Sequence, residues 1–579
     1  MLQRTLLLTG LALSSTVVPP AFGAGAVPDQ LFAQAAAGGE IPVIIELNVA
    51  VSAERDLAAA SGEAAVETQR AKIAQAQQEV LNDLQLSATA AAGDQSPGVK
   101  LFQFVPMMAL PANTHTLEIL QSHPRVKSVV PDKLSAPYDD PTPLPPEGSS
   151  AEVEPSAPLL DSSVPRIGAD IAQQYGVRGY GQTVAVLDTG VQKTHPFLAN
   201  KVVSEACYST NNSASTSTTV CPGGVTESTA SGSGVNCSSS ISGCDHGTHV
   251  AGIAAGKGGG STGVSYSGVA PEANLIAVQV FSRFTSATYC GSNSPCILTW
   301  DSDQIRGLER VYALRNTYSI AAVNMSLGGG RYYTYCNSDL RKPIIDQLRS
   351  AGIATAIASG NDDWRDSVGA PGCIETAVTV GATDDSDNVA SFSNIDDTVD
   401  FLAPGASVRS SVPTNSYAIK NGTSMATPHV AGAFALMSQL DPLATVSETE
   451  SRLAALSVQV DDNRSSGIQD GMDRIALAWM GDNRCQPTGK ITNRWGYDSS
   501  IEYSYIGLQP ENSFGESFAY LVRIPNGTSL AAMVDAATGR AANLGDEPTV
   551  TVRGSAPCPT SGTLRYIYSG DYGFMTVNQ

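Results

Sequence analysis

Charged residues are scarce in this chain, and positively charged ones are the scarcest. Only 15% of its 579 residues are Asp, Glu, Lys or Arg, against about 25% in typical soluble domains. The 34 Lys and Arg residues are outnumbered by 55 Asp and Glu residues, which gives a formal net charge of −21. Because an acidic surface repels phosphate, nucleic acids and anionic membranes are excluded as default partners.

Long apolar runs are missing except at the N-terminus. Residues 5–18 form an apolar stretch that follows Arg4 and precedes small residues around Ala24 and Ala26. This order is typical of a secretory signal peptide, and the run is shorter than the about 20 residues of a membrane span. We therefore predict a signal peptide at 1–26, secretion, and no membrane span in the mature chain.

The chain has ten cysteines, an even number. Because disulfides persist in the oxidising environment that an exported protein meets, we expect these cysteines to form disulfides. We expect Cys290 to pair with Cys296 across a short turn, Cys336 with Cys373, and Cys485 with Cys558. The pairing among four further cysteines is left open by the sequence: Cys207, Cys221, Cys237 and Cys244.

The first half of the chain predicts a small unit followed by a linker. Residues 40–135 read as an α+β unit, with strands at 41–50, 101–110 and 126–130 and helices up to 86 and at 114–121. Residues 136–165 then hold eight Pro, six carboxylates and no Lys or Arg. Such a composition is typical of a solvated linker, which we place at 136–163.

Residues 164–481 alternate short apolar strands with helical segments. The expected strands lie at 183–187, 274–279, 321–324, 353–358 and 377–380. This alternation predicts an α/β fold, a doubly wound parallel sheet whose ligands bind at the carboxyl ends of the strands. Residues 482–579 hold 11 of the 36 aromatic residues in strand-like segments, and we expect a β-rich accessory domain there.

Three segments carry residues suited to acyl transfer. AVLDTG at 185–190, DHGTHVAG at 245–252 and NGTSMATPHVAG at 421–432 contain Asp188, His246 and Ser424. A serine hydroxyl is a weak nucleophile that needs a base, and the base needs a group that orients it. Ser424 precedes a helical pattern, so its backbone N–H can stabilise an oxyanion, and Asn361 is the candidate second donor.

These motifs, with SLGG and SGN between them, resemble those of the subtilisin-like serine proteases, or subtilases, and most closely the proteinase K-like and secreted bacterial branch. The resemblance covers residues 164–481 and implies a subtilisin-like fold. It implies that His246 is the general base, that Asp188 orients it, and that Ser424 attacks the scissile carbonyl. Asn361 would complete the oxyanion hole.

The resemblance also implies how substrate and metal are bound. The substrate strand would lie beside Ser326, Leu327, Gly328 and Gly329, and the specificity pocket would be bounded by Ala358, Ser359, Gly360 and Gly369. Because Gly369 leaves the pocket floor without a side chain, we expect large hydrophobic residues before the cut bond. Calcium is expected at Glu375, Ala377 and Asp400, through two backbone carbonyls and one carboxylate, and no organic cofactor is expected.

Other interpretations of single residues stay open. The His246 and His249 spacing could suggest zinc, but the Glu of H-E-x-x-H and the remaining ligands are missing. His249 and His429 are expected to be packed histidines. Three acidic residues could set a charge preference for the substrate, or could simply cap helices or be exposed to solvent: Asp301, Asp362 and Asp363. Residues 206–244 are expected to form a disulfide-stapled loop at the rim of the cleft.

Together these features predict a monomeric, secreted endopeptidase that hydrolyses protein or peptide substrates broadly. The N-terminal unit resembles the inhibitory propeptide of subtilases and would be removed by the enzyme itself, at a bond the sequence does not identify. Two alternatives remain: a noncatalytic binding protein on a protease scaffold, and a processing protease dedicated to one bond. Labelling by a serine-reactive probe would separate the first, and poor cleavage of casein would favour the second.

Overall fold

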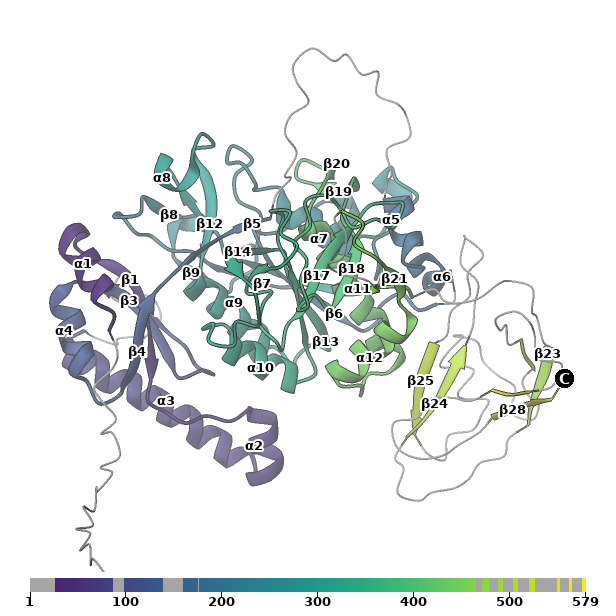
Figure 1. Cartoon of the computed structure of the whole chain (residues 1–579), viewed down its shortest axis with the longest axis horizontal. Coiled ribbons are helices and arrows are strands. Elements are labelled where there is room, and N and C mark those ends of the chain that lie inside the picture. Colours follow the sequence, from purple (N-terminus) through teal and green to yellow (C-terminus); the bar gives the residue numbers. More distant parts are fainter. Residues whose placement is uncertain are drawn as a thin grey trace, which may run out of the picture.

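The computed structural model describes residues 27–86, 98–138, 160–174, 176–464 and 471–477, and short strands within 488–578. The predicted signal peptide, most of the predicted linker and the predicted Cys485–Cys558 pair lie outside these residues. Within them, no helix has the length and apolarity needed to cross a membrane. The described chain comprises an N-terminal α+β unit, a central α/β unit and strands near the C-terminus (Figure 1).

The N-terminal unit is a four-stranded antiparallel sheet with helices packed on it. In sheet order the strands are β2 (Lys100–Leu101), β3 (Met107–Ala112), β1 (Ile41–Leu47) and β4 (Val126–Pro131). The helices are α1 (Asp29–Gly38), α2 (Glu54–Ser61), α3 (Glu63–Asp83) and α4 (Thr114–Ser122). Their apolar faces bury a core that includes Val43, Ile45, Val80 and Leu117.

One predicted strand of this unit, 101–110, is wrong in extent, because residues 102–106 leave the sheet. Gln77 Nε2 donates to the carbonyls of Phe102 and Met107 and so bridges the two ends of this excursion, at 2.7 and 2.8 Å. Phe104 at its centre packs edge-on against Tyr312 of the central unit, with ring centroids 4.9 Å apart. The excursion therefore brings Phe104 into contact with the central unit.

The central unit is built on a ten-stranded sheet whose middle strands are parallel, which confirms the α/β prediction. In sheet order the strands are β21 (Val458–Val460), β22 (Met472–Arg474), β18 (Phe401–Pro404), β17 (Val378–Thr383), β15 (Ala354–Ala358), β13 (Ile320–Met325), β6 (Thr183–Asp188), β10 (Asn274–Gln279), β7 (Val202–Tyr208) and β9 (Glu227–Ser228). All five predicted strands are present. Every residue of β6 is buried, as expected for a strand covered on both faces.

Helices cover both faces of this sheet, and alternate residues of β6 separate the two cores. Val184 and Val186 join the core made with α7 (His246–Ala255) and α11 (Thr423–Leu440). Ala185 and Leu187 join the core made with α9 (Asp301–Ala313) and α10 (Lys342–Ser350). Further helices of this unit are α5 (Leu160–Arg166), α6 (Ala169–Gln174), α8 (Ala287–Cys290) and α12 (Val446–Leu456).

A second sheet joins the two units. Its strands in order are β16 (Val368–Ala370), β14 (Leu327–Tyr332), β5 (Leu134–Pro137), β12 (Cys296–Trp300), β11 (Ser282–Phe284) and β8 (Ser217–Thr219). β5 is the end of the N-terminal unit, and it runs into the central unit between β14 and β12 (Figure 1). The predicted linker boundary at Ala136 therefore falls inside a strand, and the boundary at Val164 falls inside α5.

Strands also occur in the C-terminal region, for which the sequence predicts β structure. One sheet has the order β26 (Thr549–Thr551), β23 (Thr488–Thr492), β28 (Met575–Asn578) and β27 (Gly562–Leu564), and β24 (Tyr503–Leu508) pairs with β25 (Tyr520–Pro525). A hairpin of β19 (Val408–Val412) and β20 (Ser416–Lys420) belongs to the central unit.

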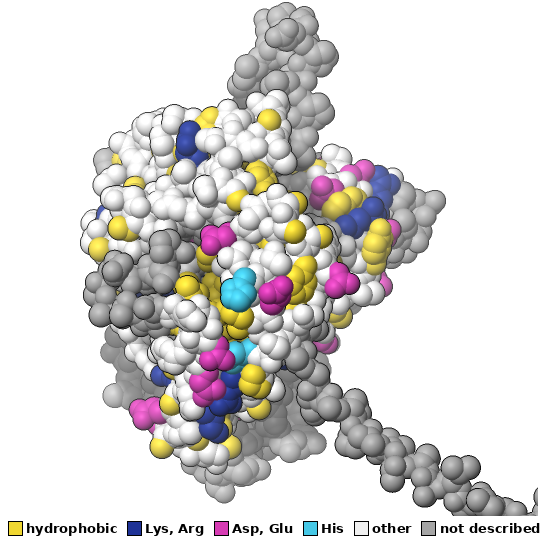
Figure 2. Space-filling view, turned by 90° about the vertical axis from the view of Figure 1, so that its left-hand side faces the viewer, with side chains coloured by type: hydrophobic (Ala, Val, Ile, Leu, Met, Phe, Trp, Pro, Cys, Tyr) yellow, Lys and Arg dark blue, Asp and Glu magenta, His cyan; other side chains and the backbone are white. Residues whose placement is uncertain are grey.

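On the face that includes the N-terminal unit, acidic and basic side chains are few and interspersed (Figure 2).

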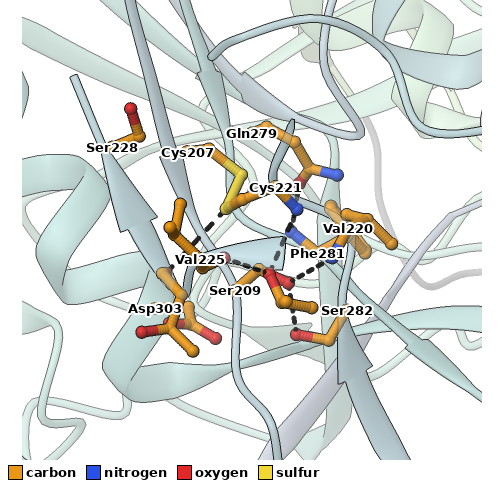
Figure 3. Close-up of a disulfide and its surroundings, with 12 residues drawn as sticks. Cys207, Ser209, Val220, Cys221, Val225, Ser228, Gln279, Phe281, Ser282 and Asp303 are labelled. Carbon is orange, nitrogen blue, oxygen red and sulfur yellow. Dashed lines mark hydrogen bonds between the residues drawn. A yellow bond between two sulfur atoms is a disulfide. The ribbon is translucent and has the colours of Figure 1, made fainter. Parts of the chain in front are cut away.

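Four disulfides lie within the described residues. Cys290–Cys296 and Cys336–Cys373 confirm two predictions, and the open set resolves into Cys207–Cys221 and Cys237–Cys244. The Cys207–Cys221 bond staples the inserted loop to β7 (Figure 3). Beside it Ser209 Oγ accepts from the Val220 N–H at 3.1 Å and lies 3.0 Å from Ser282 Oγ, so the loop is tied to β11 as well.

Candidate active site

Asp188 and His246 form a buried hydrogen-bonded pair. Asp188 is the last residue of β6 and His246 the first of α7, and both side chains are fully buried. His246 Nδ1 lies 2.8 and 3.0 Å from the two Asp188 carboxylate oxygens, and the Thr189 N–H donates to Oδ1 at 2.7 Å. Because an ionised carboxylate only accepts, Nδ1 carries the proton in this contact, which leaves the Nε2 lone pair of a neutral ring available as a base.

Ser424 is the second residue of α11 and is fully buried. Its hydroxyl donates to the Ser326 carbonyl at 3.1 Å, and the Ser326 hydroxyl donates back to the Ser424 carbonyl at 2.9 Å. Ser326 follows β13, which pairs with β6, so Ser424 lies at the same strand ends as Asp188. Activation of Ser424 requires its hydroxyl hydrogen to turn from the Ser326 carbonyl toward a base.

Asn361 holds a carbonyl oxygen supplied by the N-terminal unit. Its Nδ2 donates to Tyr138 O at 2.9 Å. Its Oδ1 accepts from both the N–H and the hydroxyl of Thr423, each at 2.9 Å. Since the backbone N–H can only donate, this contact fixes the amide with Nδ2 toward Tyr138.

The backbone at the start of α11 also surrounds the Tyr138 carbonyl. Gly422 has a φ of +146°, and a Cβ at this position would lie 2.8 Å from Tyr138 O and 3.6 Å from Ser424 N. The Tyr138 carbonyl thus sits between the Asn361 amide and the N-terminus of α11, where backbone N–H groups favour negative charge. A side chain at position 422 would displace it.

The Tyr138 side chain fills a pocket made of glycines. A Cβ at Gly369 would lie 1.9 Å from the Tyr138 hydroxyl oxygen, one at Gly328 would lie 2.6 Å from it, and one at Gly360 would lie 3.4 Å from Cζ. The pocket therefore has the depth of a tyrosine because Gly369 has no side chain. Burial raises the pKa of the Tyr138 hydroxyl.

The segment leading to Tyr138 is bound as an extended strand. β5 pairs antiparallel with β14, Leu327 opposite Pro137 and Gly328 opposite Ala136. On its other edge it pairs with β12, Thr299 opposite Ser135 and Trp300 opposite Leu134. The extended segment beside Leu327 and Gly328 is thus the chain's own β5, in the place where the sequence analysis expects a substrate strand.

The sequence matches a known family over this unit. Residues 179–470, half of the chain, match the model of the Subtilase family. The chain belongs to the subtilase family. Subtilisin DY from Bacillus licheniformis is 33% identical over 310 residues, which are 53% of this chain and 94% of that protein. Subtilisin NAT from Bacillus subtilis subsp. natto is 29% identical over 367 residues, which are 63% of this chain and 78% of that protein.

Among solved structures, that of a cold adapted subtilisin-like serine proteinase is 26% identical, with a TM-score of 0.37, and covers 53% of this chain and 91% of that one. The strand order of the central sheet and the family match establish the subtilase as an α/β serine endopeptidase, a hydrolase that acts on proteins.

The remaining predicted residues of this subtilase lie around the site in different roles. Ala358 ends β15, and the Ser359 carbonyl accepts from the Gly369 N–H at 2.8 Å, which joins the two walls of the pocket. Gly329 pairs with Ala370. Asp362 Oδ2 accepts from the Asn394 amide at 3.1 Å, and Asp363 forms ion pairs with Arg365 and Arg464.

The two other motif histidines are buried away from this chemistry. His249 Nε2 lies 3.0 Å from the Ala418 carbonyl, and burial lowers its pKa to about 3. His429 Nε2 lies 2.9 Å from Ser163 Oγ, and burial lowers its pKa to about 4. Both rings are therefore neutral at ordinary pH. His246 and His249 bind different partners, so the H-x-x-H spacing does not form a metal pair.

The predicted calcium ligands start two neighbouring strands. Ala377 directly precedes β17 and Asp400 directly precedes β18, which pairs with it in parallel. Asp400 Oδ2 accepts from the Thr379 N–H at 2.7 Å, and the Glu375 carboxylate accepts from Asn337 at 2.9 Å. Carbonyl and carboxylate oxygens are the kinds of ligand that calcium prefers. In the described part of the chain, no three His, Cys, Asp or Glu side chains form a metal cluster.

The residue that sequence reasoning missed is Tyr138. The prolines around it place it within the predicted solvated linker. The available signal is that Tyr138 is the sole aromatic residue in the segment 131–165. An aromatic residue after Leu-Ser-Ala-Pro marks a point of burial within an otherwise solvated composition.

Proposed function

We propose that this subtilase is secreted as a self-inhibited precursor, with Asp188, His246 and Ser424 as its catalytic triad. One observation carries the proposal: the Tyr138 carbonyl accepts from Asn361 while its ring fills the glycine pocket, so the chain's own strand occupies the position of a substrate. The apolar N-terminal stretch supports export, and disulfides are typical of exported proteins.

The proposed chemistry rests on the contact between Asp188 and His246 and on the place of Ser424 at the same strand ends. Ser424 Oγ attacks the carbonyl carbon while His246 Nε2 accepts its proton, and Asp188 stabilises the imidazolium that forms. The oxyanion is held by Asn361 Nδ2 and the Ser424 N–H. His246 then protonates the leaving amine. A water molecule, activated by His246 in the same way, attacks the acyl-enzyme and releases the acid product.

The bond cut during maturation would be Tyr138–Asp139, since the Tyr138 carbonyl is the one in the oxyanion position. After this cut, the N-terminal unit would stay bound through β5 as a product inhibitor. The same pocket gives a preference for large hydrophobic and aromatic residues before the cut bond. Broad digestion of extracellular protein by a monomer fits an enzyme whose main selectivity is one roomy pocket.

A structural role is proposed for calcium. A calcium ion held by Asp400 and carbonyls near Glu375 and Ala377 would tie together the starts of β17 and β18. Calcium would supply rigidity there and no chemistry, because these residues lie at the strand ends opposite to Asp188. Added calcium should therefore raise the unfolding temperature of the wild-type enzyme, and that of Asp400→Ala much less.

Serine labelling tests the proposed chemistry. Ser424→Ala should abolish reaction with a fluorophosphonate probe, casein cleavage and maturation, whereas Ser451→Ala, a change at an exposed helix serine, should leave all three intact. Labelling of purified Ser424→Ala at the wild-type rate would refute the triad assignment.

A further inference from the structure

Lys100 of the N-terminal unit places its ammonium group among three oxygen atoms of the central unit. Its Nζ lies 2.7 Å from Thr210 Oγ1, 2.6 Å from Ser302 Oγ and 2.7 Å from Asp303 Oδ1. Ser302 and Asp303 lie in the first turn of α9, and Thr210 lies just after β7. We call these three oxygen atoms the Lys100 seat. The N-terminal unit thus supplies a cation to a seat that the central unit builds.

The seat presents lone pairs, and not hydrogens, toward Lys100. The Thr210 hydroxyl donates its hydrogen to Asp303 Oδ2 at 2.7 Å, and the Ser302 hydroxyl donates to Asp132 Oδ2 at 2.5 Å. Each hydroxyl oxygen is therefore an acceptor toward the ammonium group, which has three donors and no acceptor. Three acceptors around one point favour a cation.

The seat is held by contacts within the central unit. The Thr210 N–H donates to Ser282 Oγ at 2.8 Å, and the Ser217 hydroxyl donates to the Thr210 carbonyl at 2.6 Å. The Cys207–Cys221 disulfide closes the same segment, and Asp303 lies beside it on α9 (Figure 3). Departure of the N-terminal unit therefore leaves the seat oxygens in place.

A cavity of about 490 Å³ adjoins the seat and gives water and ions a path to it. Lys100, Thr210 and Ser302 are among its lining residues. The Asp303 side chain is only 1% exposed, and among the described residues Lys100 is its only ion-pair partner. When the N-terminal unit leaves, this carboxylate loses its counter-charge, which is unfavourable unless another cation replaces it.

Calcium suits the seat better than magnesium does. Calcium binds oxygen at about 2.3–2.6 Å in flexible geometry, whereas magnesium demands about 2.0–2.1 Å and a nearly ideal octahedron. The seat oxygens surround Lys100 Nζ at 2.6 to 2.7 Å, so calcium fits with small movements, and water from the cavity completes its shell. Because the seat holds one carboxylate, we expect a weak site with a Kd of about 0.1–1 mM.

We propose that a calcium ion takes the place of the Lys100 ammonium group when the N-terminal unit leaves, bound by Thr210, Ser302 and Asp303. This inference rests on the proposed role of the N-terminal unit as an inhibitor that is released. Because the ion and Lys100 exclude each other, calcium favours the released enzyme. The site is separate from the calcium position expected at Glu375, Ala377 and Asp400.

Uncut precursor tests the site without any catalytic step. In Ser424→Ala the N-terminal unit stays attached and Lys100 fills the seat, whereas the added change Lys100→Ala opens it. Isothermal titration calorimetry with calcium chloride should find one additional calcium ion per chain in the double variant, with a Kd of about 0.1–1 mM. Adding Asp303→Asn should remove this ion.

The controls separate the seat from other calcium sites. Asp366→Asn changes an exposed carboxylate that pairs with Arg331, and it should leave the additional ion bound. Magnesium chloride should bind the opened seat much more weakly than calcium chloride. Equal calcium binding with and without Lys100→Ala would overturn the proposal, as would an additional ion that survives Asp303→Asn. Equal binding of magnesium would overturn the choice of calcium.

Release of the cut N-terminal unit gives the functional readout in the wild type. With a Kd of about 1 mM, calcium at about 10 mM should raise the dissociation constant of the cut unit about tenfold, measured by size-exclusion chromatography. Choline chloride at equal ionic strength is the reference, and release in Asp303→Asn should not respond to calcium. An equal effect of choline would overturn the proposed exchange, because salt screening alone would explain it.

The two experiments distinguish this inference from the proposed function. A wild-type precursor that is never cut contradicts the proposed function, while calorimetry on the uncut precursor still decides the cation site. A precursor that is cut normally but gains no calcium ion on Lys100→Ala contradicts the cation site alone.

Discussion

Asn361 Nδ2 lies 2.9 Å from the carbonyl oxygen of Tyr138, although 223 residues separate the two in the chain. The contact joins the end of the N-terminal unit to the position that we propose for the oxyanion in the central unit. It selects one peptide carbonyl out of the whole segment, because a shift of β5 by one residue would turn its side chains to the opposite faces. This register is the basis of the predictions on catalysis, specificity and release that follow.

Replacing Asn361 by Ala should lower kcat about 100- to 1000-fold with a smaller effect on KM. One oxyanion donor removed costs rate of this order, because it stabilises the transition state more than the ground state. Steady-state kinetics on a Tyr peptide measure both constants. The control is Asn337→Ala, an exposed asparagine bound to Glu375. A change in KM alone would show that Asn361 only binds substrate.

Gly369→Ala should shorten the main pocket. The added methyl carbon would lie 1.9 Å from the Tyr hydroxyl oxygen, and overfilling a packed site costs about 1–3 kcal/mol. We expect kcat/KM for a Tyr peptide to fall about tenfold or more relative to a Leu peptide. Gly329→Ala, on the neighbouring strand β14, is the matched control, since its Cβ would make only ordinary contacts, the nearest at 3.7 Å. Equal effects of the two changes would contradict the assigned floor.

Lys100→Met should loosen the N-terminal unit. Lys100 Nζ donates to Thr210 Oγ1, Ser302 Oγ and Asp303 Oδ1 at 2.7, 2.6 and 2.7 Å, and the Asp303 side chain is only 1% exposed. Removing the cation leaves that carboxylate buried and uncompensated in the complex, a loss of about 3–5 kcal/mol. Activity after maturation should therefore appear much sooner.

The control for Lys100 is Lys127→Met. Lys127 pairs with Glu46 at 3.3 Å, and its side chain is 64% exposed. Exposed pairs contribute about 0–1 kcal/mol, so the activation time should stay near wild type. Similar acceleration in both variants would mean that general destabilisation of the unit, and not the buried contact, controls release.

Release of the cut N-terminal unit should be faster at pH 8 than at pH 5. Glu309 Oε1 accepts from the Phe104 N–H at 2.6 Å, and burial raises the Glu309 pKa from 4.5 to about 7. Burial likewise raises the pKa of Asp132 to about 6. Groups whose pKa is raised in the complex favour it fully below their ordinary pKa, and this contribution is lost as the pH rises through the raised value.

Size-exclusion chromatography measures this release independently of the catalytic rate. Glu309→Gln should flatten the pH dependence between pH 5 and 8, because the amide keeps an acceptor for Phe104 and does not titrate. Release that is faster at pH 5 in the wild type would contradict the assigned direction.

How much the sequence predicts depends on the range of the interactions. The strands of the parallel sheet are predicted well because each, like β6, is buried on both faces and reads as a continuous apolar run. The excursion at 102–106 is missed because Phe104 packs on a residue far along the chain, Tyr312. Local composition cannot show such a contact.

The range of the interactions also separates the site residues that the sequence predicts from those that it misses. The sequence alone can single out the motif residues Asp188, His246 and Ser424, because their local patterns are distinctive. Tyr138 is missed because β5 is a strand only through its pairing with β14 and β12.

The mass of the N-terminal unit released during maturation tests the central claim most directly. Mass spectrometry of the cut unit from wild-type enzyme should find a C-terminus at Tyr138, and Ser424→Ala should remain uncut. A unit that ends at another residue, or a pure Ser424→Ala precursor that is cut after Tyr138, would contradict the claim that Ser424 cleaves the bond after Tyr138.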